Sequence, residues 1–302
     1  MTDRATGRVI AAHGRHYSVE LGDGTVLRCF PRGKKTDATV GDQVEILLQG
    51  AHEGSLERIL PRKNLLYRSD EARSKQFAAN VDQLLIVVAV VPPFSEDLLG
   101  RALAGAWSAD ISPVVVLNKV DLVDGLAQAR ASLAPIIRLG VRVIELCARD
   151  ERQVHERLLP LLAGKTSLLL GQSAMGKSTL LNMLIPDALA ATREHSVALG
   201  AGRHTTTSTR LYHLPGKVGD LIDSPGFQAF GLLHLTLDEI QHGFPEFQAH
   251  IEQCRFYNCS HQHEPGCGIL AALARGEIDA ARHALYVRLL HARQAHASNH
   301  HG

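Results

Sequence analysis

Residues 171–178, with the sequence GQSAMGKS, carry the strongest chemical signal in this chain. They fit the pattern G-x-x-x-x-G-K-[S/T], whose glycines let the backbone curl around a phosphate. Lys177 can neutralise β- and γ-phosphate charge, and the Ser178 hydroxyl can ligate Mg²⁺. An apolar run precedes the motif and a helix-forming run follows it, as such a loop requires. The predicted phosphate site comprises Gly171, Gln172, Ser173, Ala174, Met175, Gly176, Lys177, Ser178 and Thr179.

A second motif, Asn118-Lys-Val-Asp121, could bind the base of the nucleotide. It ends an apolar run typical of a buried strand, and ligands bind at the carboxyl ends of such strands. The Asp121 carboxylate can accept from the two N–H donors on the edge of guanine. Adenine lacks one of these donors, so a site built on that bond would reject it by roughly 10⁴-fold. The predicted base contacts are Asn118, Lys119, Val120 and Asp121, with a backbone N–H from Cys147–Ala148 directed at guanine O6.

The two motifs occur in an unusual order. In an ordinary GTPase the phosphate loop comes first and the guanine motif follows later in the chain, whereas here Asn118 precedes Gly171. Since the other expected parts are present, the order predicts a GTP-hydrolysing domain whose chain is circularly permuted.

Two further segments could respond to the γ-phosphate. Asp223, after a short strand-like run, is expected to hold Mg²⁺ through water, and the Gly226 N–H is expected to contact the γ-phosphate. A threonine among residues 205–207 should ligate Mg²⁺; we favour Thr206, although three adjacent threonines leave the choice open.

The residue that orients the attacking water is less clear. Phe227 stands where many GTPases place a glutamine for this purpose, so we expect slow intrinsic hydrolysis and a partner that completes the site. His234 is a candidate water-orienting group, and a purely structural role for it is equally open.

A third cluster has the spacing of a metal site. Cys254, Cys259, His261 and Cys267 supply three thiolates and one imidazole, a closed tetrahedral set suited to one structural Zn²⁺. His263 is a weaker rival for the histidine position. Free core cysteines are the alternative interpretation.

The elements that must position these residues fall into three regions. Short strand-like runs up to about residue 62 indicate a small barrel such as an oligonucleotide-binding (OB) fold, or else another small β-domain. Its basic stretch could bind a nucleic-acid backbone and stack a base, or form a solvated loop. That stretch comprises Arg28, Phe30, Arg32, Lys34 and Lys35.

Strands and helices then alternate, which predicts a doubly wound α/β sheet. The expected strands are 81–90, 113–118, 141–146, 166–170 and 219–222, and the expected helices are 95–108, 126–139 and 151–162. After about residue 230 only helices are expected, over 237–251 with a break at Pro245 and over 269–297 with a break at Gly276. The predicted domains are therefore a barrel (1–66), a permuted GTPase domain (67–230) and a zinc-binding helical domain (231–302).

Composition limits the remaining classes of protein. Hydrophobic residues make up 45% of the 302 and charged residues 21%, with a net charge of +1. No global basic field argues for nucleic acid, so any such contact needs local patches. No apolar leader or membrane-length segment is evident, which favours a cytoplasmic protein without membrane contact.

Together these residues resemble a known family, the bacterial ribosome small-subunit-dependent GTPases, over nearly the whole chain. The resemblance is carried in order by 118–121, 171–179, 202–207, 223–227 and the Cys254–Cys267 cluster. It implies an OB-like barrel, a permuted GTPase domain and a zinc-stabilised helical domain. It further implies a monomer that binds GTP and GDP, contacts 16S rRNA, and hydrolyses GTP under stimulation by the 30S subunit late in its assembly.

One residue departs from that family pattern, and two other functions must be weighed. Ala174 replaces an expected glycine; if the position needs a positive φ, alanine costs about 1 kcal/mol. A P-loop enzyme that phosphorylates a small molecule would leave Asp121 without a purpose. A non-catalytic RNA-binding adaptor would leave Lys177, Ser178 and Asp223 unexplained.

Overall fold

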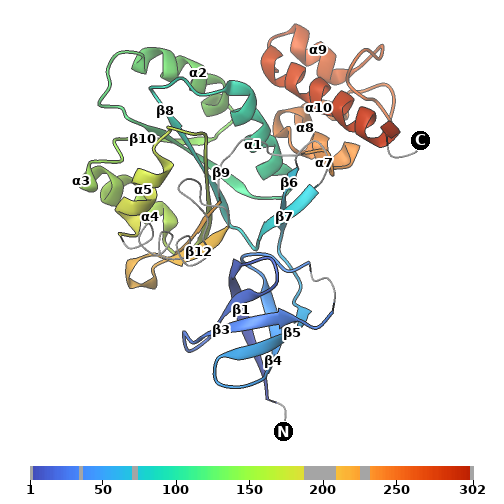
Figure 1. Cartoon of the computed structure of the whole chain (residues 1–302). Helices are drawn as coiled ribbons and strands as arrows, with labels where there is room; N and C mark the ends of the chain where they lie inside the picture. The colour runs from blue at the N-terminus through green and yellow to red at the C-terminus, as the bar shows by residue number, and fades with distance from the viewer. Residues whose placement is uncertain (1–2, 34–36, 70–73, 187–208, 225–231, 300–302) are drawn as a thin grey trace.

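A computed structural model describes residues 3–33, 37–69, 74–186, 209–224 and 232–299. Figure 1 shows a barrel at the N-terminus, a central sheet flanked by helices, and a helical region at the C-terminus. The predicted segments Arg203–Thr207 and Gly226–Phe227, together with Lys34 and Lys35, lie outside the described residues.

The N-terminal region is a closed five-stranded barrel. Its strands are β1 (Arg4–Ala12), β2 (Tyr17–Leu21), β3 (Val26–Pro31), β4 (Gln43–Leu48) and β5 (Glu53–Ile59). β1 pairs with both β2 and β4, and the parallel β3–β5 pair completes the ring. Inward-facing residues alternate along each strand, so one face of every strand fills the interior. Val9, Val19, Cys29, Val44 and Ile46 are fully buried there. The predicted barrel is confirmed.

A two-stranded hairpin follows the barrel and was not expected from the sequence. It consists of β6 (Leu65–Ser69) and β7 (Ser74–Ala79), which pair only with each other. In Figure 1 it lies between the barrel and the C-terminal helices. Gly41 shows how closely it approaches the barrel. A Cβ on Gly41 would lie 2.1 Å from the Ala79 carbonyl oxygen, and the φ of Gly41 is +93°.

The central sheet has the order β10-β9-β8-β11-β13-β12. Its strands are β8 (Gln83–Ala89), β9 (Ser112–Asn118), β10 (Arg142–Leu146), β11 (Thr166–Gly171), β12 (Arg210–His213) and β13 (Asp220–Asp223). The first five in this order are parallel, and β12 is antiparallel to β13. Every residue of β8 and β11 is buried, which explains their uninterrupted apolar runs. At Ala11 and Arg210 β1 pairs with β12, so the barrel and this sheet share one hydrogen-bonded sheet.

The helices of the central region largely follow the expected bounds. They are α1 (Glu96–Ser108), α2 (Leu126–Arg138), α3 (Glu151–Gln153), a π-helical turn η1 (Val154–Leu158), α4 (Leu159–Leu162) and α5 (Lys177–Leu184). Ser95 caps α1, as predicted, by accepting from the Leu98 N–H. The expected helix 151–162 instead contains the π-helical turn. Pro160 follows it and has no N–H to continue regular α-helical bonding.

Only helices occur after residue 231 in the described part of the chain. They are α7 (Leu237–His242), η3 (Pro245–Phe247), α8 (Gln248–Ile251), α9 (Gly268–Ala274) and α10 (Ala280–Asn299), with breaks at the predicted Pro245 and Gly276.

This helical region docks on α1 of the central domain. The Arg282 guanidinium lies over the rings of Phe244 and Trp107 and pairs with the buried Glu246. Arg288 of α10 donates to Asp97 of α1 over 2.6 Å. No helix among the described residues is long and apolar enough to cross a membrane.

Candidate functional site

Three parallel strands bring the predicted nucleotide motifs to one edge of the sheet. Asn118 ends β9, Gly171 ends β11 and Asp223 ends β13. Their registers align: Asn118 pairs with Ala89 of β8, and Leu169, two residues before the end of β11, pairs with Asp223. Residues far apart in sequence therefore meet at the carboxyl ends of the strands, where ligands bind in such sheets.

The glycines of the phosphate loop are required by close approaches. A Cβ on Gly176 would lie 2.2 Å from the Asn118 Nδ2, and the φ of Gly176 is +92°. A Cβ on Gly171 would lie 3.0 Å from the Val87 carbonyl oxygen. The loop therefore packs directly against β8 and the residue that ends β9. Ser178 and Thr179 are exposed in the first turn of α5.

Ala174 occupies the left-handed region, with φ of +65°. Position 174 therefore needs a positive φ, although alanine carries a Cβ and the family pattern has glycine there. Alanine in this conformation costs roughly 1 kcal/mol relative to glycine.

The Asn118 side chain ties three loops together. Its Nδ2 donates to the Met175 carbonyl oxygen over 2.9 Å. Its Oδ1 accepts from the Lys119 and Ala148 N–H groups, each over 2.8 Å. Lys119 adds a second link, because its ammonium donates to the carbonyl oxygens of Ala174 and Val91. The loop ending in Asp121 is thereby held against the phosphate loop, and Asp121 itself is exposed.

The dipeptide Cys147–Ala148 uses both of its N–H groups within the protein. The Cys147 N–H donates to Gln153 Oε1 over 3.0 Å, and the Ala148 N–H donates to Asn118. The sequence predicts that one of these N–H groups contacts guanine O6. To do so, that N–H must share its present hydrogen bond or give it up.

Lys177 and Asp223 form a largely buried charge pair at this edge. The Lys177 ammonium lies 2.5 Å from Asp223 Oδ1 and donates to the Ser224 carbonyl oxygen over 2.8 Å. Burial raises the pKa of Asp223 above its ordinary value, and the Lys177 ammonium opposes that rise. A buried carboxylate beside a lysine could accept a hydrated Mg²⁺ ion, since oxygen ligands and retained waters suit that ion.

The remaining predicted residues fare differently. Thr206 and Gly226 lie outside the described residues. The His234 ring lies against Tyr67 of β6, with centroids 4.3 Å apart and the ring planes tilted by 37°. Gln172, predicted only as part of the loop, accepts from the Ser95 N–H over 2.9 Å and so joins the phosphate loop to the start of α1. No periodicity in the sequence signals that contact.

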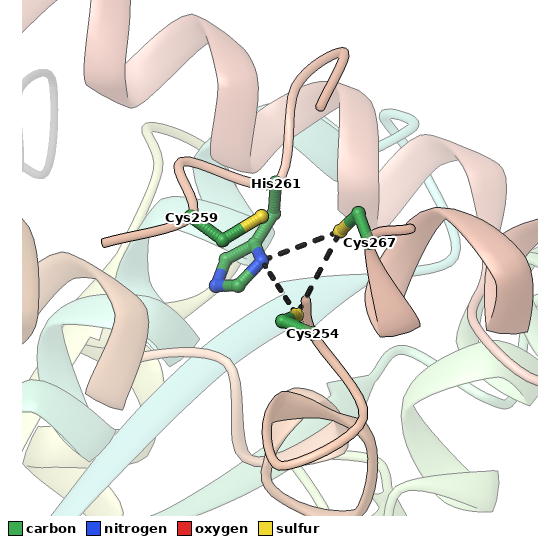
Figure 2. A group of neighbouring side chains, drawn as sticks. All are labelled: Cys254, Cys259, His261 and Cys267. Carbon is green, nitrogen blue, oxygen red and sulfur yellow. Dashed lines mark hydrogen bonds between the residues drawn. The ribbon is translucent and has the colours of Figure 1, made fainter. Parts of the chain in front are cut away.

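The four predicted metal ligands meet in the C-terminal region (Figure 2), and their ligand atoms all lie within 4.8 Å of one another. The His261 Nδ1 is 3.6 Å from the Cys254 Sγ and 3.5 Å from the Cys267 Sγ, and these two sulfurs are 3.9 Å apart. Ligands about 2.3 Å (sulfur) and about 2.1 Å (nitrogen) from one tetrahedral centre would be about 3.6–3.8 Å apart. The spacing of these three ligands and the set of four donors therefore fit one tetrahedral ion.

Neighbouring groups fix the orientation of these ligands. The His261 Nε2 lies 3.0 Å from Gln241 Oε1, so Nε2 carries the proton and Nδ1 faces the cluster. Burial lowers the pKa of His261, which keeps the ring neutral and able to bind a metal. The Gly268 N–H donates to the Cys254 sulfur and the Leu270 N–H to the Cys267 sulfur. His263, the rival candidate, is exposed.

Comparison with known proteins adds a family assignment to this geometry. A protein-family profile described as RsgA GTPase matches residues 59–233. A protein from Bordetella pertussis named small ribosomal subunit biogenesis GTPase RsgA is 70% identical over 289 residues, which cover 96% of each chain. A protein of the same name from Burkholderia pseudomallei is 57% identical over 291 residues, covering 96% of this chain and 92% of its own.

Two solved structures resemble the whole chain. YjeQ from Thermotoga maritima has a TM-score of 0.74 at 31% identity, covering 97% of this chain and 99% of its own. YloQ, described as a circularly permuted GTPase, has a TM-score of 0.71 at 27% identity and covers 97% and 96%. The predicted fold class, including the permuted central domain, is confirmed.

The metal cluster leads to a direct test with a matched pair of histidine variants. We expect the purified chain to hold one metal ion, His261→Ala to lose most of it, and His263→Ala to retain it. Metal content by mass spectrometry of the digested protein measures this. Because such a site contributes folding energy, His261→Ala should also lower the melting temperature. Equal metal loss in both variants would contradict the assignment.

Proposed function

Because this chain belongs to the RsgA GTPase family, we propose that it binds the 30S ribosomal subunit and hydrolyses GTP late in assembly of that subunit, with hydrolysis stimulated by the subunit. The single observation that carries this function is the meeting of Asn118, Lys177 and Asp223 at one sheet edge, with Asn118 bonded to the phosphate loop. We further propose that the protein is cytoplasmic and monomeric.

The nucleotide roles follow from this geometry. Asp121 accepts from the guanine edge, Lys119 lies along the base, and the backbone N–H groups of 171–179 surround the phosphates. Lys177 exchanges its partner Asp223 for phosphate oxygens, because an ammonium is attracted more strongly to a multiply charged phosphate than to one carboxylate. Ser178, Asp223 and Thr206 then hold Mg²⁺, which neutralises charge developing on the phosphates.

Hydrolysis needs a positioned water, and Phe227 cannot orient one. The subunit therefore completes the site. His234 remains a candidate for the water-orienting group; its ring lies against Tyr67 of β6.

The barrel supports RNA contact through an aromatic and cationic face. The Arg28 guanidinium lies 5.2 Å from the Phe30 ring centroid. His16 lies 6.0 Å from Phe30 and stacks on His13 with centroids 4.8 Å apart. The β1–β2 loop and β3 are where OB folds bind oligonucleotides. Of the basic residues predicted here, Arg32 is paired with Glu57.

The metal cluster supports a second RNA contact. We assign Zn²⁺ to it, because three thiolates and one imidazole select this ion. Tyr257, in the loop between two of the ligands, is fully exposed at 103%, and the Arg255 guanidinium lies over Phe256. Exposed aromatic rings beside arginine can stack unpaired bases of 16S rRNA.

We place the domains at 1–66, 67–230 and 231–302. The end of β5 at Ile59 and the helices after residue 231 support this division. The first boundary falls within β6, so an experimental division before Leu65 would keep the β6–β7 hairpin whole.

The proposed function has a decisive assay. We expect 30S subunits to raise GTP turnover by about a hundredfold or more, since partners of other GTPases supply roughly 10³- to 10⁵-fold. Purified 50S subunits serve as the control and should have little effect. Equal turnover with and without 30S subunits would exclude subunit stimulation, and ATP turnover at the same rate as GTP would favour a phosphotransferase.

Base recognition is tested by Asp121→Asn. The asparagine amide donates to the O2 carbonyl of xanthine but no longer accepts from the guanine amine. We therefore expect the variant to lose roughly 10⁴-fold in selectivity for GTP over xanthosine triphosphate. Competition binding with both nucleotides measures the ratio, and an unchanged GTP affinity would remove Asp121 from the base site.

Replacement of the strained residue Ala174 should increase nucleotide affinity, whereas Asp121→Asn should decrease it. We expect Ala174→Gly to tighten GDP binding by up to about fivefold, because bound phosphates hold the loop at φ of +65° while the empty loop is free to relax, and glycine adopts that φ without the cost of roughly 1 kcal/mol. Ser173→Gly, in the same loop at a residue without positive φ, should give no gain. Calorimetric titration of both variants measures the difference. A gain in Ser173→Gly equal to that in Ala174→Gly would show that loop flexibility, not strain, is responsible.

A further inference from the structure

The β12–β13 hairpin joins the barrel to the proposed metal-binding end of the central sheet. Arg210, at the start of β12, pairs with Ala11 of the barrel and also with Asp223 at the end of β13. The same hairpin connects the two predicted γ-phosphate segments, 205–207 and 223–226, along the chain. Anything that fixes the hairpin therefore fixes Asp223.

A side-chain cluster joins the other end of this hairpin to the barrel. Arg8 of β1 bonds to Asp220 at the start of β13 over 2.5 Å, and its second nitrogen donates to Thr166 of β11 over 2.7 Å. Because β11 and β13 pair directly at Thr166 and Asp220, one guanidinium links two strands of the central sheet to the barrel. The Arg8 side chain is only 18% exposed.

His213 completes the cluster between two carboxylates. Its Nδ1 lies 2.6 Å from Asp220 Oδ1, and its Nε2 lies 2.7 Å from Glu20 Oε2 of β2. An ionised carboxylate only accepts hydrogen bonds, and a neutral imidazole carries one N–H. Both contacts can therefore be hydrogen bonds only when His213 is protonated. Two cations, Arg8 and His213, then balance Glu20 and Asp220.

Among the described residues, three other charged side chains lie near this cluster. Lys217, in the turn between β12 and β13, extends toward Gly24 of the barrel. Asp82 accepts from the Thr166 N–H and pairs with Lys63. These neighbours contribute one acid and two bases. The four groups that contact one another directly are thus Arg8, Glu20, His213 and Asp220, which we call the clasp.

We propose that the clasp is a proton-dependent positioning device for GTP hydrolysis: the barrel holds the β12–β13 hairpin, and through it Asp223, more firmly while His213 is protonated. This goes beyond the proposed function and depends on it only for the role of Asp223 at the Mg²⁺ ion. Glu20 and His213 are positioning residues, since neither lies at the nucleotide edge.

The direction of the pH effect follows from the proton count. Histidine loses its proton within the physiological pH range. At low pH both His213 contacts are charge-assisted hydrogen bonds. Once the ring is neutral at higher pH, one ring nitrogen of His213 faces its carboxylate with a lone pair instead of an N–H, and that contact is repulsive. The barrel then holds the hairpin more weakly. The phosphate and guanine loops end β11 and β9, so nucleotide affinity is affected less than turnover.

Amide hydrogen exchange on the full chain tests the clasp itself. Exchange is followed in peptides covering β1 and the β12–β13 hairpin at about pH 5.5 and about pH 8, with labelling times rescaled for intrinsic exchange. In the wild type we expect protection to fall by about tenfold or more at the higher pH, because a charge-assisted hydrogen bond is lost. Equal protection at both pH values would overturn the proton dependence.

Glu20→Gln separates protonation from contact. The glutamine amide can donate to neutral Nε2 while Nδ1–H donates to Asp220, so this variant should keep its protection at both pH values. His242→Gln is the control: His242 also pairs with an aspartate, Asp110, but it lies in α7, outside the barrel and the hairpin. It should behave as the wild type. A fall in Glu20→Gln as large as in the wild type would overturn the role of His213.

Steady-state kinetics of GTP hydrolysis test whether His213 positions Asp223. In His213→Ala, we expect kcat for GTP to fall by about threefold or more at about pH 5.5 with KM changed less than about twofold, and the ratio to wild type to approach one at about pH 8. Loss confined to KM, or a pH-independent deficit, would overturn positioning. If the wild type itself failed to hydrolyse GTP with 30S subunits, the proposed function would fail, while the exchange result would still decide whether the clasp exists.

Discussion

One side chain, the amide of Asn118, holds the nucleotide edge together. It bonds to the phosphate loop through Met175, to its own loop through Lys119 and to the loop after β10 through Ala148. An amide has both donors and acceptors, so it can join loops that offer carbonyl oxygens and N–H groups at once. This amide occupies the space that a Cβ at position 176 would need, so glycine is required there. Chain order does not matter to such a junction, which depends only on which strands are neighbours. This is why a permuted chain can retain the chemistry of an ordinary GTPase.

The sequence was sufficient to predict the features that repeat locally or recur as motifs. Fully buried strands such as β8 leave continuous apolar runs, Ser95 is a recognisable cap, and Cys254 and Cys267 have a spacing typical of metal ligands. The same spacing favours His261, which lies in the cluster, over His263. Ala174 stands where the family pattern has glycine, and its φ of +65° is one that glycine adopts more readily. Each of these signals depends on a few neighbouring residues.

Contacts between distant segments left no such signal. The β6–β7 hairpin has strands of only five and six residues. Strands this short show little alternation of apolar and polar residues. Arg8 and Asp220 are 212 residues apart, and nothing near either one indicates its partner. Arg282 and Trp107, which dock the C-terminal helices on α1, are a similar case. Engagement of the Cys147 and Ala148 N–H groups was likewise invisible, because it depends on where Gln153 and Asn118 lie after folding.

The position of Asn118 before its partner also has a consequence for synthesis. The barrel can close once β5 has left the ribosome, because the last of its strands ends at Ile59. β8, β9 and β10 are consecutive neighbours and can pair next. The Asn118 amide, however, must wait for Met175, 57 residues later. The end of β1 beyond its pairing with β4 must wait for β12, which pairs with it at Ala11. Domains generally fold as units from the N-terminus during synthesis. In this chain the base-binding loop is made early, but its bond to the phosphate loop forms only after Met175 has emerged, so a nascent chain completes its nucleotide site late.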